Sequence, residues 1–201
     1  MSGAPIEFYF DFSSPYGYLG AQRIDTIAAE FGRNVSWRPI LLGVIFKATN
    51  QSPLVSQPLR GPYSAHDMAR SARKLGVKFA LPDGFPFSSV YTCRVFYWLD
   101  SHSPDAAKTY ARAVYHAAFA DGRVAADPEG AADLAVGLGH DRAATLAGMQ
   151  EPAIKECLRA EVQQAMDKGV FGSPFVIVDG EPFWGNDRLT EVREWLQTGG
   201  W

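Results

Sequence analysis

Apolar and polar positions alternate along the first stretch of the chain. Ile6, Phe8, Phe10 and Phe12 recur at every second position, which is typical of a buried β-strand. Ser13-Ser14-Pro15 follows at once, and a hydroxyl before a proline is a helix-start signal. The pattern therefore predicts a strand that runs directly into a helix N-terminus, with a hydroxyl at the point of highest positive potential. A junction of this kind stabilises bound anions.

Helical spacing of apolar residues continues from this junction over residues 16–31, and Gly32 is placed to end the helix. Residues 35–42, with Val35 and Trp37 among their apolar positions, predict a second strand. Strand, helix and strand in this order form a βαβ unit. We therefore expect the two strands to be parallel and joined by a right-handed crossover.

The middle of the chain changes character twice. Residues 43–63 are rich in Gly, Pro, Asn, Ser and Gln and predict a long loop, a kind of segment that is often functional. Lys47 and Arg60 are its only cations, and each is either a solvated surface charge or a binding residue. From residue 63 to 166, helical spacing dominates around an irregular aromatic connector at 79–87, with helix starts at Ser103, Asp127 and Asp141. This region predicts a block of helices.

Strand character returns near the C-terminus. An apolar run follows Gly172-Ser173-Pro174, Asp179-Gly180 is a strong hairpin signal, and Glu181 to Trp184 would pair back antiparallel. Gly185-Asn186-Asp187 supplies a turn and an N-cap for a last helix over residues 188–197. The chain therefore closes with a ββα unit.

Composition limits the classes of function. The chain has 201 residues, 47% of them apolar, which suffices for one domain with a core or for a domain with a large insertion. A net charge of -3 gives no reason to expect nucleic acid or an anionic membrane as a partner. We find no membrane-spanning run and no signal peptide in the sequence, so the cytoplasm is the expected compartment.

Cysteines and histidines give no sign of a metal or a redox pair. Cys93 and Cys157 are far apart in helical segments, form no CxxC motif, and are more simply explained as buried small apolar residues. The four histidines have no metal-ligand spacing with cysteines or carboxylates, so we expect no metal.

The βαβ and ββα units together resemble the thioredoxin fold. In the disulfide-oxidoreductase branch of that superfamily a Cys-Pro-x-Cys motif opens the first helix, but here the same positions are Ser14-Pro15-Tyr16-Gly17. Both thiols are missing, which excludes dithiol exchange.

The serine version resembles the 2-hydroxychromene-2-carboxylate isomerases and their relatives, the kappa-class glutathione transferases. Three strings in the right order carry the resemblance over residues 6–196: Asp11-Phe12-Ser13-Ser14-Pro15, Gly169-Val170-Phe171-Gly172-Ser173-Pro174 and Trp184-Gly185-Asn186-Asp187-Arg188. The last string favours the isomerases.

The resemblance implies a domain organisation. We expect an α/β, thioredoxin-like fold (βαβ…ββα) with a large all-helical insertion. Residues 1–42 and 170–201 would form the thioredoxin-like domain, and residues 43–169 the loop plus helical insertion domain.

The resemblance also implies a cofactor, glutathione, and a catalytic residue, Ser14. The Ser14 hydroxyl would donate a hydrogen bond to the glutathione thiolate, although a simple helix N-cap is the alternative. Its neighbour Ser13 is more simply an ordinary polar residue. Pro174 would be the cis-proline of the superfamily, so that Ser173 presents its backbone N–H and C=O to the cysteinyl unit.

The γ-glutamyl end of glutathione would be held by Asn186 and Asp187, and Trp184 and Gly185 of the same string would also bind the cofactor. In this assignment Asp187 meets the ammonium group. Capping and turn formation are the alternative roles of Asn186 and Asp187, and both kinds of role can coexist.

The activity that the resemblance implies is conversion of 2-hydroxychromene-2-carboxylate to trans-o-hydroxybenzylidenepyruvate in the catabolism of aromatic compounds. The carboxylate of this small aromatic substrate needs a cation, for which Lys47 is the first choice, followed by Asn50 and Arg60. Aromatic side chains in the connector and beyond it would line the ring-binding site or simply belong to the core: Phe85, Phe87 and Tyr91.

The alternative functions are a kappa-like transferase that conjugates electrophiles and a non-enzymatic thioredoxin-like binding module. Relatives suggest a homodimer.

Overall fold

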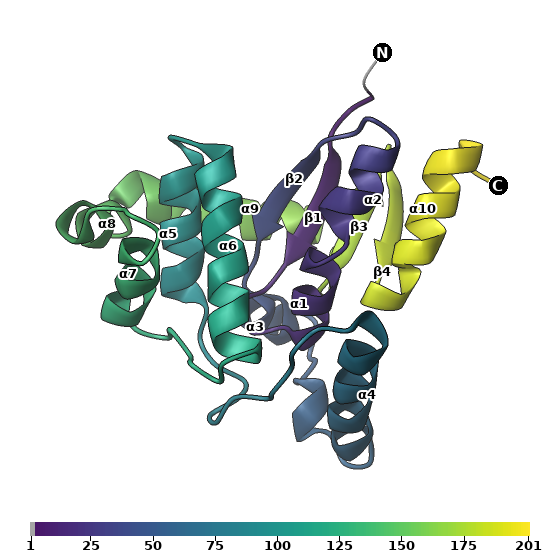
Figure 1. Cartoon of the computed structure of the whole chain (residues 1–201), viewed down its shortest axis with the longest axis horizontal. Helices are drawn as coiled ribbons and strands as arrows, with labels where there is room; N and C mark the ends of the chain where they lie inside the picture. Colours follow the sequence, from purple (N-terminus) through teal and green to yellow (C-terminus); the bar gives the residue numbers. More distant parts are fainter. Residues whose placement is uncertain (1–2) are drawn as a thin grey trace.

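The computed structural model describes residues 3–201 and has a four-stranded mixed sheet at its centre, in the order β2-β1-β3-β4 (Figure 1). Strand β1 (Ile6–Phe10) pairs in parallel with β2 (Val35–Pro39). On its other side it pairs antiparallel with β3 (Phe175–Val178), which forms the predicted hairpin with β4 (Glu181–Trp184). The predicted βαβ and ββα units are confirmed.

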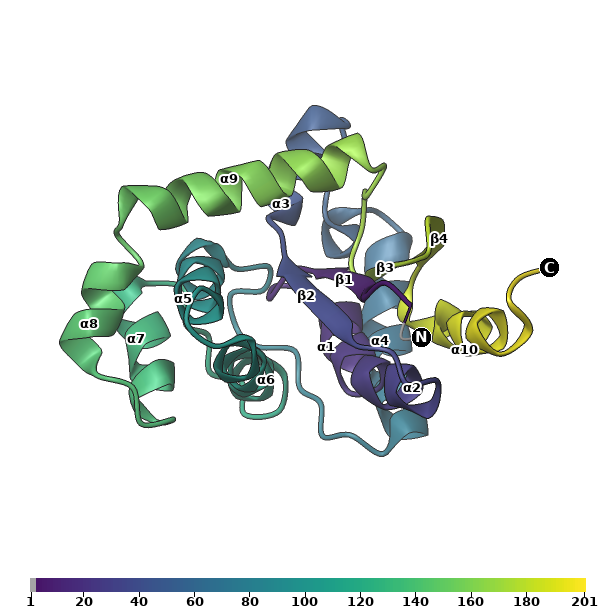
Figure 2. The same ribbon diagram turned by 90° about the horizontal axis from the view of Figure 1, so that it is seen from above.

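Helices surround this sheet. Their bounds are α1 Pro15–Ala21, α2 Ile24–Glu30, α3 Leu42–Ala48, α4 Arg60–Leu75, α5 Val90–Asp100, α6 Pro104–Phe119, α7 Pro128–Val136, α8 Arg142–Gly148, α9 Pro152–Asp167 and α10 Leu189–Thr198, with 3-10 turns η1 Leu54–Ser56 and η2 Asn186–Arg188. Helices α5 to α8 lie together beside the sheet, and α9 returns from them along the side of the sheet opposite α1 and α2 (Figure 2). The fold class, an α/β thioredoxin-like fold with many inserted helices, is confirmed.

Side chains cap the helix N-termini that the sequence predicts. Ser14, Ser103, Asp127 and Asp141 each accept a hydrogen bond from the backbone N–H three residues ahead. Such caps satisfy N–H groups that have no partner inside the helix. The helical block of the sequence prediction is therefore present in α5 to α9.

Two predicted elements have different bounds. The single helix expected over residues 16–31 is two helices, because Gln22 and Arg23 both donate their N–H to the carbonyl oxygen of Gly20 and interrupt the α-helical pattern. The strand expected over residues 35–42 ends at Pro39, and the chain enters a helix three residues later.

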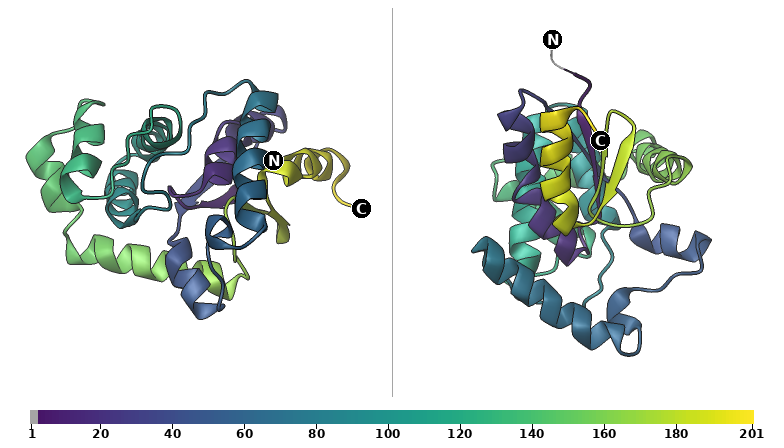
Figure 3. Two further views of the ribbon diagram at one scale, coloured as in Figure 1. Left: turned by 90° about the horizontal axis from the view of Figure 1, so that it is seen from below. Right: turned by 90° about the vertical axis from the view of Figure 1, so that its right-hand side faces the viewer.

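The long loop expected over residues 43–63 is partly wrong. This segment holds most of α3, the turn η1 and the start of α4, which gather at the end of the molecule where β1 and β2 end (Figure 3). Helix α3 begins where Asp11 Oδ2 accepts the N–H of Leu42 at 2.7 Å. That cap comes from a distant part of the sequence, so no local signal predicts the helix.

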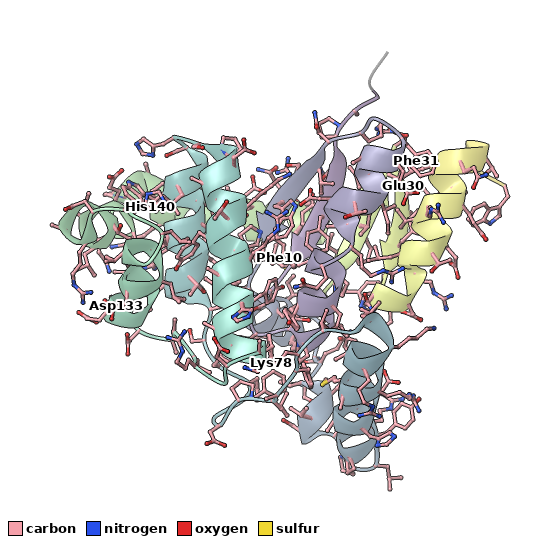
Figure 4. The ribbon with its side chains drawn as sticks, in the orientation of Figure 1. Phe10, Glu30, Phe31, Lys78, Asp133 and His140 are labelled. Atoms are coloured by element: carbon pink, nitrogen blue, oxygen red, sulfur yellow. The ribbon has the colours of Figure 1, made fainter. Side chains whose placement is uncertain are left out.

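An aromatic cluster holds the sheet against the helical block. The Phe10 ring lies between α6 and the sheet (Figure 4), with ring centroids of Trp37, Phe96 and Tyr115 at 5.4, 6.1 and 5.7 Å. Aromatic pairs at these distances contribute beyond the area they bury. The end of β1, where the chain turns into α1, is therefore fixed by packing from behind.

The assignment of residues 43–169 to a separate insertion domain stays a prediction. Within this range α4 packs on α1 and η1, beside the sheet, whereas α5 packs on α6, α7, α8 and α9. No helix in the described range 3–201 is both long and apolar enough to cross a membrane.

Candidate active site

Ser14 lies buried at the junction of β1 and α1, with 6% of its surface exposed. Its hydroxyl oxygen accepts the N–H of Gly17 at 3.0 Å, which is the N-cap bond of α1. The same hydroxyl donates to the carbonyl oxygen of Ser173 at 3.0 Å. Ser14 is therefore an N-cap and also the bridge between α1 and the segment before β3.

That segment carries the predicted cis peptide bond between Ser173 and Pro174. The Ser173 hydroxyl accepts the backbone N–H of Asp11 at 3.0 Å. The Pro174 carbonyl oxygen accepts the N–H of Gly185 at 3.0 Å. These bonds bring the three strings of the sequence together at one end of the sheet.

The Ser173 backbone differs in part from the sequence prediction, in which both its C=O and its N–H face a ligand. Its carbonyl oxygen already accepts from Ser14, so only the remaining lone pair could meet a ligand. Its backbone N–H, by contrast, makes no hydrogen bond among residues 3–201. This N–H, next to Ser14 in the structure, is therefore free to donate to a ligand.

Asp11 organises the junction from behind, a role that the sequence did not reveal. Its fully buried carboxylate accepts from the Ser13 N–H at 2.8 Å, the Leu42 N–H at 2.7 Å and the Ser89 hydroxyl at 2.8 Å. Burial raises the pKa of this carboxyl, and the three hydrogen bonds offset part of the rise. Asp11 thus joins the entry of α1 to α3 and to the start of α5.

Gly17 occupies the position at which the redox branch has its second cysteine, and the structure leaves no room for a side chain there. A Cβ atom would collide with the hydroxyl oxygen of Tyr115 and stand 2.8 Å from Ser173 Oγ. Tyr115 is held in place because its hydroxyl donates to the Asp11 carbonyl oxygen at 3.0 Å.

Ser14, Ser173 and cis-Pro174 form a corner where β1 meets α1. The string from Trp184 to Asp187 forms the side of this corner next to β4. Trp184 is half-exposed and its ring centroid lies 4.7 Å from that of Phe171. Asn186 is buried, and its Oδ1 has no hydrogen-bond partner among the described residues. The prediction that this string caps the last helix is wrong, since neither η2 nor α10 has a side-chain cap. The side chains of Asn186 and Asp187 therefore remain available for another partner.

Tyr16 links the same corner to α4. Its hydroxyl donates to Asp67 Oδ2 at 2.7 Å. Burial, this hydrogen bond and nearby negative charges, including that of Asp187, raise the pKa of Tyr16 above its usual range. The backbone N–H of Tyr16 makes no bond among residues 3–201, as is usual in a first helical turn, and it lies beside Ser14.

Comparison with known proteins agrees with this geometry. A family model described as a DsbA-like thioredoxin domain matches residues 5–197. The 2-hydroxychromene-2-carboxylate isomerase of Sphingobium xenophagum is 31% identical, over 95% of this chain and 97% of that protein. The chain belongs to the 2-hydroxychromene-2-carboxylate isomerase family of DsbA-like thioredoxin domains.

A solved structure of a 2-hydroxychromene-2-carboxylate isomerase superposes with a TM-score of 0.85 at 27% identity, over 96% of this chain and 94% of that one. Glutathione S-transferase kappa 2 of Caenorhabditis elegans is 26% identical, over 95% of this chain and 91% of that protein. The isomerase family and the kappa transferases are therefore both related to the whole fold, the helices included.

In this member of the isomerase family, the residues predicted to bind the substrate carboxylate come from α3, the turn after it and the start of α4. Lys47 is exposed in the last turn of α3 and Arg60 is exposed at the start of α4. Asn50 has a φ of 54° and follows α3 at a turn in which the Gln51 N–H bonds the Phe46 carbonyl oxygen at 2.8 Å. No hydrogen bond among residues 3–201 joins these three side chains to Ser14, so their role stays a prediction.

The aromatic residues proposed to wall the substrate are half-buried. Phe85 and Phe87 pack on Phe119 with ring centroids 6.3 and 6.1 Å away, and the Phe87 N–H donates to Ser13 Oγ at 3.0 Å. Tyr91 lies under the Arg94 guanidinium at 5.6 Å. Phe87 is thus held directly beside the corner in this family member.

Neither cysteine of this isomerase-family chain is part of the corner. Cys93 is buried and burial raises the pKa of its thiol well above the usual value, whereas Cys157 is half-buried. Across residues 3–201, no group of three or more His, Cys, Asp or Glu side chains is arranged to hold a metal ion.

Proposed function

We propose that this protein is a glutathione-dependent isomerase that converts 2-hydroxychromene-2-carboxylate to trans-o-hydroxybenzylidenepyruvate. The observation that carries the proposal is the position of Ser14: a hydroxyl, in place of a redox thiol, at the start of α1 and bonded to Ser173 beside cis-Pro174. A serine there cannot form the mixed disulfide that a cysteine would form with glutathione.

Glutathione fits the polar groups that the fold leaves unpaired. Its ammonium group needs an acceptor, which the exposed Asp187 carboxylate can provide, and the neighbouring Asn186 Oδ1 is buried without a partner among residues 3–201. Its peptide backbone needs a donor, which the Ser173 N–H supplies. A hydrogen bond between an ammonium group and a carboxylate is charge-assisted and therefore among the stronger ones.

Bound glutathione would supply a thiolate that adds reversibly to the conjugated double bond of the substrate and so permits rotation about it. Ser14 acts as the hydrogen-bond donor at this site. The N–H of Gly17 holds the Ser14 oxygen in place, and the hydroxyl proton can turn from the Ser173 carbonyl oxygen toward the sulfur. With the Tyr16 N–H it favours the charged form of a thiol and lowers its pKa.

Substrate binding is assigned to the cations at the end of the sheet that carries the corner. We propose that Lys47 meets the substrate carboxylate, with Asn50 and Arg60 as further contacts. Phe85, Phe87 and Tyr91 would lie against the aromatic ring. A homodimer and a cytoplasmic location are part of the same proposal and rest on the family resemblance.

A steady-state assay tests the proposal. Isomerisation should proceed through many turnovers on a small amount of glutathione, with the free thiol concentration unchanged at the end. Loss of thiol in proportion to product would contradict the isomerase and would favour a kappa-like transferase. Calorimetry on the same preparation addresses the binding-module alternative, because a module without this function would show no heat with glutathione.

A further inference from the structure

A cavity lies between α3, α5 and α9, and none of its lining residues belongs to the Ser14 corner. Its volume is about 300 Å³. Helices α3 and α9 are on the opposite side of the sheet from α1 (Figure 2), and α9 passes over both α3 and α5. None of the residues that line this cavity belongs to the set proposed above for glutathione or for the substrate.

The walls of the cavity are mostly apolar. The aliphatic side chains come from the segment that enters α3 and from the three helices: Leu41, Val44, Val90, Leu158, Val162 and Met166. A cavity of this size, with apolar walls and few polar groups, is at the lower end of the range for small-molecule sites. It has room for one or two fused rings and too little for a peptide or a nucleotide.

The polar lining is positively charged. Arg94, Lys155 and Arg159 line the cavity, and its lining contains no Asp or Glu. Arg159 pairs with Glu156 on the surface of α9. Arg94 and Lys155 make no ion pair within residues 3–201, so two positive charges beside an apolar cavity lack a counter-ion.

Arg94 is the most informative of these residues. It is half-buried, and its buried Nε has no hydrogen-bond acceptor in the described part of the chain. Its guanidinium stacks on the Tyr91 ring, which fixes the planar group in one place. A half-buried guanidinium without a counter-ion favours binding of a carboxylate, which can accept two of its N–H groups.

We propose that this cavity is a second ligand site, which binds a small aromatic carboxylate independently of glutathione. The ring would lie among the aliphatic walls, and the carboxylate would meet Arg94 with Lys155 nearby. The site is separate from the thiolate corner, so it neither requires nor excludes the isomerase activity.

Calorimetry on the full chain without glutathione tests this site with 2-naphthoate as the probe and 2-naphthamide as its uncharged isostere. We expect 2-naphthoate to bind, and 2-naphthamide to bind at least about tenfold more weakly, because it lacks the charge that Arg94 pairs with. Equal affinity for the two probes, or no heat with millimolar 2-naphthoate, would overturn the proposal.

Matched variants locate the binding. Arg94→Gln should weaken 2-naphthoate binding about tenfold or more. Lys155→Gln should also weaken it, and because Lys155 is exposed this second variant leaves the interior intact. Val44→Phe, at the half-exposed rim, should weaken it by filling space. Arg73→Gln, on the exposed face of α4, and Lys47→Gln, at the proposed substrate site, should leave it within twofold. If Lys47→Gln abolished binding while Arg94→Gln did not, the probe would be in the proposed substrate site and the second site would be wrong.

Discussion

Ser14 Oγ donates a hydrogen bond to the carbonyl oxygen of Ser173 at 3.0 Å, although the two residues are 159 positions apart in the sequence. This bond joins the first helix to the segment before β3. The same oxygen accepts from Gly17, so both of its neighbours are fixed before any ligand is present. The only freedom left to Ser14 is rotation of its proton, which is what a thiolate donor needs.

Replacing Ser14 by alanine should lower kcat about 100-fold, as loss of a positioned hydrogen-bond donor does in other enzymes. It should also cost about 1 kcal/mol of unfolding free energy, because the N-cap bond to Gly17 is lost. Ser103→Ala is the matched control, since Ser103 Oγ accepts the Ala106 N–H in the equivalent N-cap bond at the start of α6, outside the site. Isomerase kinetics and urea unfolding separate the two effects; wild-type kcat in Ser14→Ala would remove Ser14 from the chemistry.

Asp187→Asn should raise the Kd of glutathione about tenfold or more, because a charge-assisted hydrogen bond to the ammonium group is weakened. The melting temperature should stay the same, since Asp187 caps no helix in the structure. Calorimetry with glutathione measures the first quantity. Glu191→Gln, which alters a surface ion pair with Arg188 in the same region, should leave the Kd unchanged.

Lys47→Gln should raise the KM for the substrate about tenfold with little change in kcat. The reason is that the positive charge of Lys47, paired with the substrate carboxylate, contributes to binding and not to bond rotation. Lys74→Gln, in the exposed last turn of α4, is the control. Initial rates at saturating glutathione measure both constants. An unchanged KM in Lys47→Gln would exclude this lysine from the substrate site.

Asp11 should make the fold less stable as the pH rises. Burial raises the pKa of its carboxyl above the value of about 4 in the unfolded chain, so the folded state binds more protons between the two values. The stabilisation is complete below pH 4 and is lost as the pH rises through the folded pKa. Urea unfolding of the wild type and Asp11→Asn between pH 4 and 8 measures it: the free energy difference in favour of the wild type should fall. A flat or rising difference would mean that the three hydrogen bonds outweigh burial.

Gly17→Ala should cost about 1–3 kcal/mol of unfolding free energy, since the new Cβ collides with the Tyr115 hydroxyl. Adding Tyr115→Phe removes that hydroxyl and should restore part of the loss, which a double-mutant cycle detects. Gly43→Ala is a matched control, because nothing lies within 4 Å of its Cβ position. The collision is absent in solution if Gly17→Ala and Gly43→Ala unfold alike.

The parts of the fold that local pattern predicts are those with local causes. The alternating residues of β1, the capping side chains of Ser14, Asp127 and Asp141, and the Asp179-Gly180 turn each act over a few residues. The start of α3 could not be predicted, because the carboxylate that caps it is on Asp11, beyond β2.

The candidate site divides in the same way. Ser14, Pro174 and Asn186 could be named from short strings, but what surrounds them could not. Tyr115 reaches the corner from α6, and Asp67 reaches Tyr16 from α4, by packing between helices far apart in the sequence. Neither tyrosine nor aspartate at these positions has a local signal that distinguishes it from a surface or core residue.

The contact behind Gly17 has an evolutionary consequence. Restoring a dithiol would require a cysteine at residue 14 and another at residue 17, and the second has no space while Tyr115 keeps its hydroxyl in place. A cysteine at residue 14 alone would be one thiol without a resolving partner, and exchange with glutathione disulfide would cap it as a mixed disulfide and release reduced glutathione. A working dithiol at these positions would therefore need substitutions at residues 14, 17 and 115 together, so the proposed dependence on the sulfur of glutathione is difficult to reverse one mutation at a time.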